Sequence, residues 1–389
     1  MIDYGYIPVA SDFMDEQHKK NIQNKFSLLF NEFNIEEIRE PGLADICFYF
    51  IITGGTEQQV LDLIKNDTSH KYYLLAYGDN NSLPASLEIL ARLQLDGKKG
   101  EIIYLQNEND RVSLDRVINP KRRTLPGKRI GLVGQPSDWL VASSPVSKGI
   151  EAEWQVKVVD VPLNELQKDF LILRKELSQS TISANYPDVA EPSQTELLDA
   201  EAVYLALKQI VKRYKLDALT LRCFDLVLDN QTTGCYALAR LNDEGIIAGC
   251  EGDIISALGL LWAKEKFGKT AWMANPARIY PETNELVIAH CTLPLSLCEN
   301  VKVRSHFESG LGVAFAGTLP LGKVTIFRLG GSRAEKIWIA KGEIIEVPTE
   351  ETLCRTQVRI KLSDKYRVSE LLTQPLGNHL IMVYGEISP

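Results

Sequence analysis

The chain has 389 residues, enough for two or three domains, and 45% of them are apolar, which excludes a chain disordered throughout. Its 43 Lys and Arg against 51 Asp and Glu give a net charge of −8, which argues against a dedicated nucleic-acid-binding protein. No apolar run reaches the roughly 18 residues of a membrane span, and the N-terminus does not resemble a signal peptide. Seven scattered cysteines without a CxxC pair indicate reduced thiols in a cytoplasmic protein.

The first 120 residues alternate strand and helix patterns. We expect strands at residues 6–11, 43–53, 72–77 and 101–105, with helices between them, which is typical of βαβ units in a parallel sheet. Asn80 and Asn81 follow the third of these strands, where they could contact sugar hydroxyls or simply form a turn. The Pro- and Arg-rich residues 119–129 read as a linker, so we expect an N-terminal α/β domain at residues 1–125.

A second α/β region follows the linker. After a strand at 130–133 comes Gly134-Gln-Pro-Ser-Asp-Trp139, a turn that could hold an anion or a hydroxyl, although any βα turn can look like this. The capping box Ser193-Gln-Thr-Glu196 should open a helix that runs to about Tyr214. We expect this central domain to span residues 126–298.

Four strands in the central region each end in a polar residue. The strands at 218–224, 246–250, 270–274 and 285–289 are followed by Asp225, Glu251, Asn275 and His290. In a parallel α/β sheet the ligand site lies beyond the carboxyl ends of the strands. If the strands are neighbours, these four side chains should therefore converge on one rim.

After residue 298 the pattern changes to short strands separated by glycine turns. Strands at 301–305, 312–316, 323–329, 336–341 and 357–361 predict an antiparallel sheet or small barrel at residues 299–389. The predicted fold class is therefore α/β: two Rossmann-like parallel-sheet domains followed by a mostly antiparallel, barrel-like C-terminal domain.

Carboxylate and imidazole groups in the second half of the chain form the ligand set of a divalent cation. Glu251 with His290, His306 and His379 could supply it, although the spacing is not specific. Each residue also has a structural interpretation. Glu251 could balance Arg240, Asp253 could be the N-cap of the next helix, Asn275 could belong to a turn before Pro276, and the histidines could be ordinary strand-end residues.

Four blocks of sequence resemble the metal-site blocks of the L-fucose isomerase and L-arabinose isomerase superfamily. They are Ala248-Gly-Cys-Glu-Gly-Asp253, Met273-Ala-Asn-Pro276, Ile288-Ala-His-Cys291 and Gly377-Asn-His379, and the likeness covers residues 215–385. It is strongest to the shorter L-fucose isomerase-like proteins. The resemblance implies a Mn²⁺-dependent ketol isomerase that interconverts an aldose and a ketose, and a homo-oligomer, trimer or hexamer, in which a neighbouring subunit completes the site.

The resemblance also implies roles for individual residues. Glu251 matches the first catalytic and metal-binding acid, and Asn275 stands where the second acid is expected. His379 and His290 match two histidine ligands. His306 and Glu308 look like a further pocket segment. The other candidate substrate contacts, Asp225, Asp253, Asn80 and Asn81, come from their positions after strands.

Asn275 departs from the superfamily pattern, because an amide can ligate a cation but cannot accept a proton at neutral pH. Three outcomes stay open: Glu251 acts as the single base, another carboxylate (Asp225, Asp253 or Glu308) takes the second role, or isomerase chemistry has been lost. The first two outcomes keep a sugar isomerase, and the third favours a non-catalytic sugar-binding or regulatory protein on the same scaffold. A metal-dependent lyase or epimerase that uses the same ene-diol chemistry is a further hypothesis, and it would also need Glu251.

Overall fold

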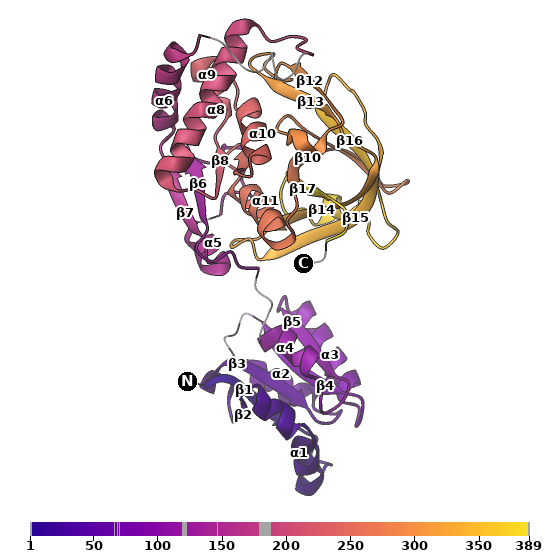
Figure 1. Ribbon diagram of the computed structural model, residues 1–389. Coiled ribbons are helices and arrows are strands. Elements are labelled where there is room, and N and C mark those ends of the chain that lie inside the picture. Colours follow the sequence, from indigo (N-terminus) through magenta and orange to yellow (C-terminus); the bar gives the residue numbers. More distant parts are fainter. Residues whose placement is uncertain are drawn as a thin grey trace. The chain divides into compact units, whose positions relative to one another are not determined.

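The computed structural model describes residues 2–387 except residues 66, 68, 70, 119–122, 146 and 179–187. The chain divides into two compact units, Met1–Arg122 and Arg123–Pro389 (Figure 1). Residues 119–122 of the expected linker lie outside the described part of the chain. Both the expected central domain and the expected C-terminal domain fall within the second unit.

The first unit is a parallel sheet with a hydrophobic cluster on each face. Its strands pair in the order β2-β1-β3-β4-β5, all parallel, as the alternation of strand and helix patterns predicted. Side chains alternate along β3, so that Phe48 and Phe50 join one cluster and Tyr49 and Ile51 the other. The elements are β1 (Ile2–Val9), α1 (Glu16–Glu32), β2 (Ile35–Glu37), η1 (Pro41–Leu43), β3 (Ala44–Ile51), α2 (Glu57–Lys65), β4 (Tyr72–Tyr77), α3 (Ser82–Leu95), β5 (Gly100–Leu105) and α4 (Arg111–Ile118).

The second unit begins with a four-stranded parallel sheet in the order β7-β6-β8-β9. The elements of this α/β part are β6 (Arg129–Val133), α5 (Ser147–Trp154), β7 (Lys157–Val161), α6 (Leu163–Glu176), α8 (Gln194–Tyr214), β8 (Ala218–Leu221), α9 (Phe224–Asn230), α10 (Cys235–Asp243), β9 (Ile247–Cys250) and α11 (Ile254–Phe267). The strand expected at 218–224 stops at Leu221, because Cys223 already caps α9 and Asp225 lies in its first turn.

Helix caps in the second unit follow the sequence signals. Ser193 and Glu196 form a complete capping box at the start of α8. The Asp253 side chain accepts a hydrogen bond from the backbone N–H of Ser256, which confirms Asp253 as the N-cap of α11. Gly268 ends the same helix with φ of 61°, a left-handed conformation that glycine adopts without strain.

The rest of the second unit is built on a closed six-stranded barrel. Its strand order is β10-β11-β16-β15-β14-β17, and all of these pairs are antiparallel. The elements are β10 (Ala271–Tyr280), β11 (Glu285–His290), η2 (Leu295–Leu297), β12 (Asn300–Arg304), β13 (Ala314–Thr318), β14 (Gly322–Gly330), β15 (Lys336–Glu346), β16 (Thr356–Leu362), α12 (Glu370–Thr373) and β17 (Leu380–Tyr384). β12 and β13 pair with each other beside the barrel. The predicted fold class, α/β with an antiparallel C-terminal part, is confirmed.

The strands expected at 270–274 and 285–289 do not extend the parallel sheet. They form β10 and β11, an antiparallel hairpin of the barrel. A tight turn joins them, in which the Asn284 N–H donates to the Pro281 carbonyl and Asn284 has φ of 56°. A turn this short reverses the chain, whereas a parallel pair needs a crossover of a dozen or more residues. The four strand ends therefore do not share one rim of one sheet.

Helix α11 joins the parallel sheet to the barrel. All of residues 254–263 are buried, so the helix is enclosed on every side rather than amphipathic. Trp262 packs edge-to-face on Phe327 of β14, and Gly259 lies close to Ile381 of β17 and to Phe327. This packing brings the start of α11 next to the barrel (Figure 1).

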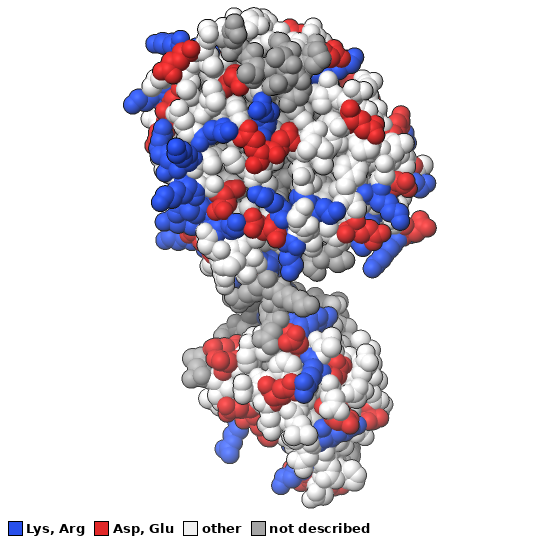
Figure 2. Space-filling model, in the orientation of Figure 1, with Lys and Arg blue, Asp and Glu red and all other residues white. Residues whose placement is uncertain are grey.

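Charged side chains of both signs are interspersed on the face of the molecule shown in Figure 2. Ion pairs also connect α6 and α8, where Arg213 pairs with Glu165 at 2.9 Å and with Asp169 at 2.7 Å. Among the described residues, no helix combines the length and the hydrophobicity that crossing a membrane requires.

Candidate metal centre

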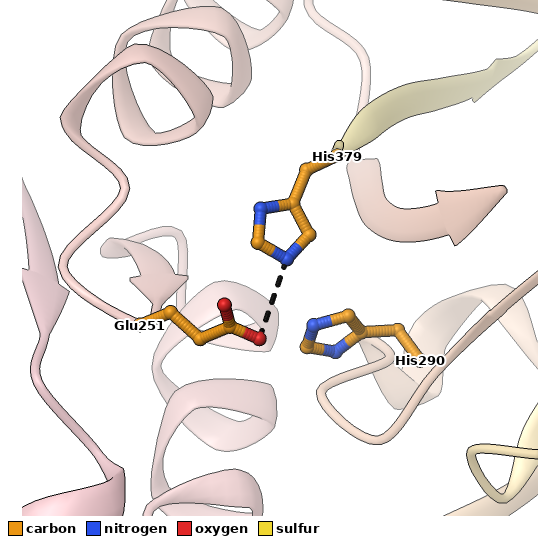
Figure 3. A group of neighbouring side chains, drawn as sticks. All are labelled: Glu251, His290 and His379. Atoms are coloured by element: carbon orange, nitrogen blue, oxygen red, sulfur yellow. Dashed lines mark ion pairs between the residues drawn. The ribbon is translucent and has the colours of Figure 1, made fainter. Parts of the chain in front are cut away.

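Three buried side chains from distant parts of the second unit meet beside the barrel. Glu251 follows β9, His290 ends β11 and His379 precedes β17. Each offers one ligand atom, and these atoms all lie within 4.8 Å of one another. Figure 3 shows the carboxylate and the two imidazole rings turned toward a common point. One carboxylate and two imidazoles at this spacing form a group that could hold a divalent cation.

Glu251 is presented by a strained turn. Its backbone has φ of 62° and that of Gly252 has φ of 73°, so two successive residues are left-handed. For a residue with a side chain this conformation costs on the order of 1–3 kcal/mol, and such strain gathers at functional sites. The turn is held in place because the Ser137 N–H donates to the Glu251 carbonyl at 2.9 Å.

Trp139 fixes one oxygen of the Glu251 carboxylate. Its indole Nε1–H donates to Glu251 Oε2 at 2.6 Å, while Glu251 Oε1 faces His379 Nε2 at 3.5 Å. Trp139 therefore orients the carboxylate so that its second oxygen points to the cluster. Trp139 belongs to the Gly134–Trp139 turn that the sequence marked as a possible binding turn, but nothing in the sequence connected it with Glu251.

The two ring nitrogens of His379 have different surroundings. Nδ1 lies 2.9 Å from Asp253 Oδ2, and Nε2 is buried without a hydrogen-bond partner. A buried polar atom without a partner is costly in a folded protein. The arrangement is the one found in metalloproteins, in which a carboxylate holds one nitrogen of a histidine and the other nitrogen binds the metal. These residues therefore fit a cation.

His290 is held from behind by Thr292. Its Nδ1 lies 2.9 Å from the Thr292 hydroxyl and accepts a hydrogen bond from the Thr292 backbone N–H at 3.3 Å. The His290 and His379 rings lie 5.5 Å apart, centroid to centroid, in an edge-to-face arrangement. The two imidazoles therefore approach the carboxylate from different strands of the barrel.

The electrostatics of the cluster favour a positive charge at its centre. Burial alone would raise the pKa of Glu251, but the imidazole of His379, 3.5 Å away, and the hydrogen bond from Trp139 outweigh it and lower the pKa. Burial would lower the pKa of His379, but the carboxylates of Asp253 and Glu251 raise it to about 9. Burial and the neighbouring His379 lower the pKa of His290 to about 4. His379 is thus the nitrogen base that is most strongly surrounded by negative charge.

Two members of the cluster, Glu251 and His290, line a cavity of about 680 Å³, and so does Asn378, the neighbour of His379. Asn275, His306 and Glu308 also line this cavity, together with Trp139 and Phe224. The Phe224 ring contacts both Trp139 and His306 edge-to-face. Five cysteines complete the wall: Cys223, Cys235, Cys250, Cys291 and Cys354.

Two of the candidate acids lie elsewhere. Asp225 pairs with Arg222 at 2.9 Å and lines a separate cavity. Asp253 is buried behind His379. Burial alone would raise its pKa, but the charge of Arg328 and the hydrogen bond with His379 lower it well below the usual range. Glu251 does not balance Arg240, because the ion pair of Arg240 is with Glu244 at 3.6 Å.

Asn80 and Asn81 belong to the first unit. Both are left-handed, and Asn80 Nδ2 donates to the Tyr77 hydroxyl at 2.8 Å, while the Gly54 N–H donates to the Asn80 carbonyl at 2.9 Å. These contacts are those of a turn between β4 and α3.

The chain is similar to proteins named sulfoquinovose isomerase. It is 24% identical over 190 residues to the protein of Alkalicoccus urumqiensis, which covers 47% of this chain and 43% of the relative. It is 25% identical over 189 residues to that of Priestia megaterium, covering 47% and 42%, and 27% identical over 196 residues to that of a Clostridium strain, covering 48% and 43%. The chain therefore matches less than half the length of these relatives, and no family model matches it.

Proposed function

We propose that the protein is a metal-dependent sugar isomerase that interconverts an aldose and a ketose through an ene-diol. The observation that carries the proposal is the buried Nε2 of His379, which has no hydrogen-bond partner and faces Glu251 and His290, two residues that line the cavity. The similarity to sulfoquinovose isomerases supports the reaction class. Glu251, His290 and His379 would hold the cation, with Asn275 as a possible amide ligand on the same wall. We propose Mn²⁺ as this cation, from the resemblance of the sequence blocks.

A bound divalent cation would polarise the carbonyl and hydroxyl oxygens of the sugar and so make the adjacent C–H acidic. Glu251 is the base that we propose for this proton: it takes the proton from C2 of the aldose and returns it to C1, which yields the ketose. Removal of a general base costs about 10²–10⁴-fold in rate. Trp139 keeps the carboxylate ionised and oriented, since it donates to Oε2.

A hydroxyl proton must also move from O2 to O1, and we propose Glu308 for this second role. Asp225 lines another cavity, and Asp253 is occupied by three side-chain donors. Among the described residues, Glu251 and Glu308 are the carboxylates that line the cavity. Cys354 lines the same wall; its hydrogen bond with Cys291 and its burial raise the pKa of its thiol, and the charges of Glu308 and Glu251 raise it further. Asn275 cannot take this role, because an amide accepts no proton at neutral pH.

The substrate we propose is a small sugar, and the oligomer we propose is a trimer or hexamer. The cavity of about 680 Å³ lies within the range of small-molecule sites. Trp139 lines the cavity, and 50% of its surface is exposed. A sugar ring or a neighbouring subunit could cover this apolar surface. The described residues that line the cavity include no lysine or arginine, so neutral and anionic sugars need to be compared.

Hydrogen exchange tests the proposal. The protein is incubated with Mn²⁺ in D₂O and a panel of neutral, phosphorylated and sulfonated sugars, and the C1 and C2 hydrogens are followed by NMR. We expect deuterium at these carbons with at least one sugar, lost on chelation and lost in Glu251→Gln. Glu282→Gln, in the exposed turn before β11, is the matched control and should behave as wild type.

The same samples decide between turnover and binding alone. Sugar binding without exchange, and without dependence on metal, would support a non-catalytic sugar-binding protein and overturn the isomerase proposal. Exchange that persists at the wild-type rate in Glu251→Gln would remove Glu251 from the role of the base.

A further inference from the structure

Arg328 is a buried cation in the barrel. It lies on β14, and 1% of its surface is exposed. A buried charge is costly unless it is paired and hydrogen-bonded. Its Nη1 donates to Asp253 Oδ2 at 2.9 Å and to the Ser256 hydroxyl at 2.6 Å, and its Nη2 donates to the Ser143 hydroxyl at 2.6 Å. The guanidinium fork thus holds three side chains from outside the barrel at once.

Asp253 receives this cation on the same oxygen that holds His379. Its Oδ1 caps α11, and its Oδ2 accepts from Arg328, from the Ser256 hydroxyl and from His379 Nδ1. Asp253 is 0% exposed, so no water competes for these contacts. The carboxylate cannot turn without breaking the helix cap, and its position therefore fixes the direction of the His379 ring.

We infer that Arg328 and Asp253 are positioning residues of the metal centre, which hold the His379 imidazole so that Nε2 faces Glu251 and His290. Arg328 acts through Asp253 and touches neither the cation nor the sugar. The inference rests on the metal centre of the proposed function, but not on the identity of the sugar or on turnover.

Gly377 shows how closely this arrangement is packed. A Cβ atom at Gly377 would lie 2.6 Å from Arg328 Nη2 and 2.9 Å from the Ser143 hydroxyl oxygen, and the residue has φ of 144°. The Gly377-Asn-His379 segment therefore needs glycine because the guanidinium passes against its backbone. A side chain there would displace Arg328 or the segment that carries His379.

A purely structural role is the competing explanation, since breaking a buried ion pair by removing one partner strongly destabilises a protein. Arg328→Lys keeps the charge but loses the planar fork that bridges Asp253, Ser256 and Ser143. Ser143→Ala removes a single hydrogen bond and leaves the ion pair intact. The two variants separate ring orientation from folding.

The experiment is a Co²⁺ titration of the metal-free protein, in which binding is measured by calorimetry and by the visible absorption of bound Co²⁺. Removal of a residue that orients a metal ligand typically weakens metal binding by about 10–100-fold. We expect this loss in Arg328→Lys, with an altered Co²⁺ spectrum, and a smaller loss in the same direction in Ser143→Ala. Arg359→Lys is the matched control, because Arg359 pairs with Glu285 on the barrel at 2.6 Å and should leave Co²⁺ binding unchanged.

Wild-type affinity and an unchanged spectrum in Ser143→Ala and in folded Arg328→Lys would overturn the inference. If Arg328→Lys does not fold, Ser143→Ala alone decides. A wild-type protein that binds no Co²⁺ would also overturn it. Loss of Co²⁺ affinity in these variants, together with no hydrogen exchange for any sugar in the wild type, would support the positioning role and leave the isomerase proposal as the part that fails.

Discussion

Replacing Asn275 by aspartate should tighten the binding of a divalent cation. Asn275 lines the cavity next to the cluster, and its Cα pairs in register with Ala289, the neighbour of His290. The cluster has a single carboxylate, so the substitution doubles the negative charge that faces the cation. It also restores the acid that the resemblance to the fucose and arabinose isomerases leads one to expect at this position.

Coulomb's law gives the magnitude. At a separation of about 6 Å, slightly more than the 4.8 Å spread of the ligand atoms, and at an effective dielectric constant of about 20, a unit negative charge attracts a divalent cation by roughly 5.5 kcal/mol. The two carboxylates repel each other by roughly 2.8 kcal/mol, so that one of them keeps a proton in the metal-free protein. The cation must displace this proton, which reduces the gain by about the same amount. The net gain of roughly 2.7 kcal/mol is an upper estimate, so we expect a Kd that is about 10- to 100-fold lower.

The assay is a calorimetric titration of chelator-treated protein with Mn²⁺ at pH 7. Asn109→Asp is the control. It adds the same charge at an exposed position of the first unit, whereas the cluster belongs to the second unit, and it should leave the Kd unchanged. An unchanged or higher Kd in Asn275→Asp would show that the side chain at 275 does not face the cation, and the reasoning would fail.

Three further predictions concern the turn, the ligand and the pH dependence. Gly252→Ala should lower the free energy of unfolding by at least about 1 kcal/mol, measured by urea denaturation, because a Cβ there would meet the backbone of residues 135–136 at a positive φ. Trp139→Phe should weaken Mn²⁺ binding by about tenfold, whereas Trp338→Phe, which removes an indole bond to Glu370 in the barrel, should not; equal Kd values in both variants would contradict the role of Trp139. Burial would raise the pKa of Glu191, but Arg304 and Ser305 lower it to about 2, so its contribution to stability is complete above the ordinary pKa and disappears as the pH falls through 2. The stability difference between wild type and Glu191→Gln should shrink over that range, and a difference independent of pH would refute the pairing.

Much of the local structure could be predicted from the sequence. Several strands of the parallel sheets follow from apolar runs that end at polar turns, as at β4, where the expected residues 72–77 match Tyr72–Tyr77, whereas the three-residue strand β2 was not predicted. The capping box at Ser193 was also predicted, and the N-cap interpretation of Asp253 was correct, because both caps depend on side chains within three residues of the helix start. The metal-centre residues were suggested by four short blocks and by the resemblance that they carry.

The pairing of strands was the first feature that sequence patterns could not decide. β10 and β11 have the same apolar pattern as a buried parallel strand, but their short connection and long-range partners place them in the barrel. Asp225 illustrates the consequence: it follows a strand as Glu251 does, but it lies in the first turn of α9 and pairs with Arg222. The sequence shows only that a polar residue follows a strand. The strand with which that strand pairs in the folded protein determines which cavity the residue lines.

The sequence alone therefore determined the order of the elements, their caps and the chemical types available for a metal centre. Only the tertiary structure decided which of those groups meet. Asp253 and His379 are 126 positions apart, and Trp139 and Glu251 are 112 apart, so no periodicity or local hydrogen bond relates them. Arg328 is the clearest case: a charge within an apolar strand signals a buried partner, but only the packing of α11 against the barrel identifies that partner as Asp253.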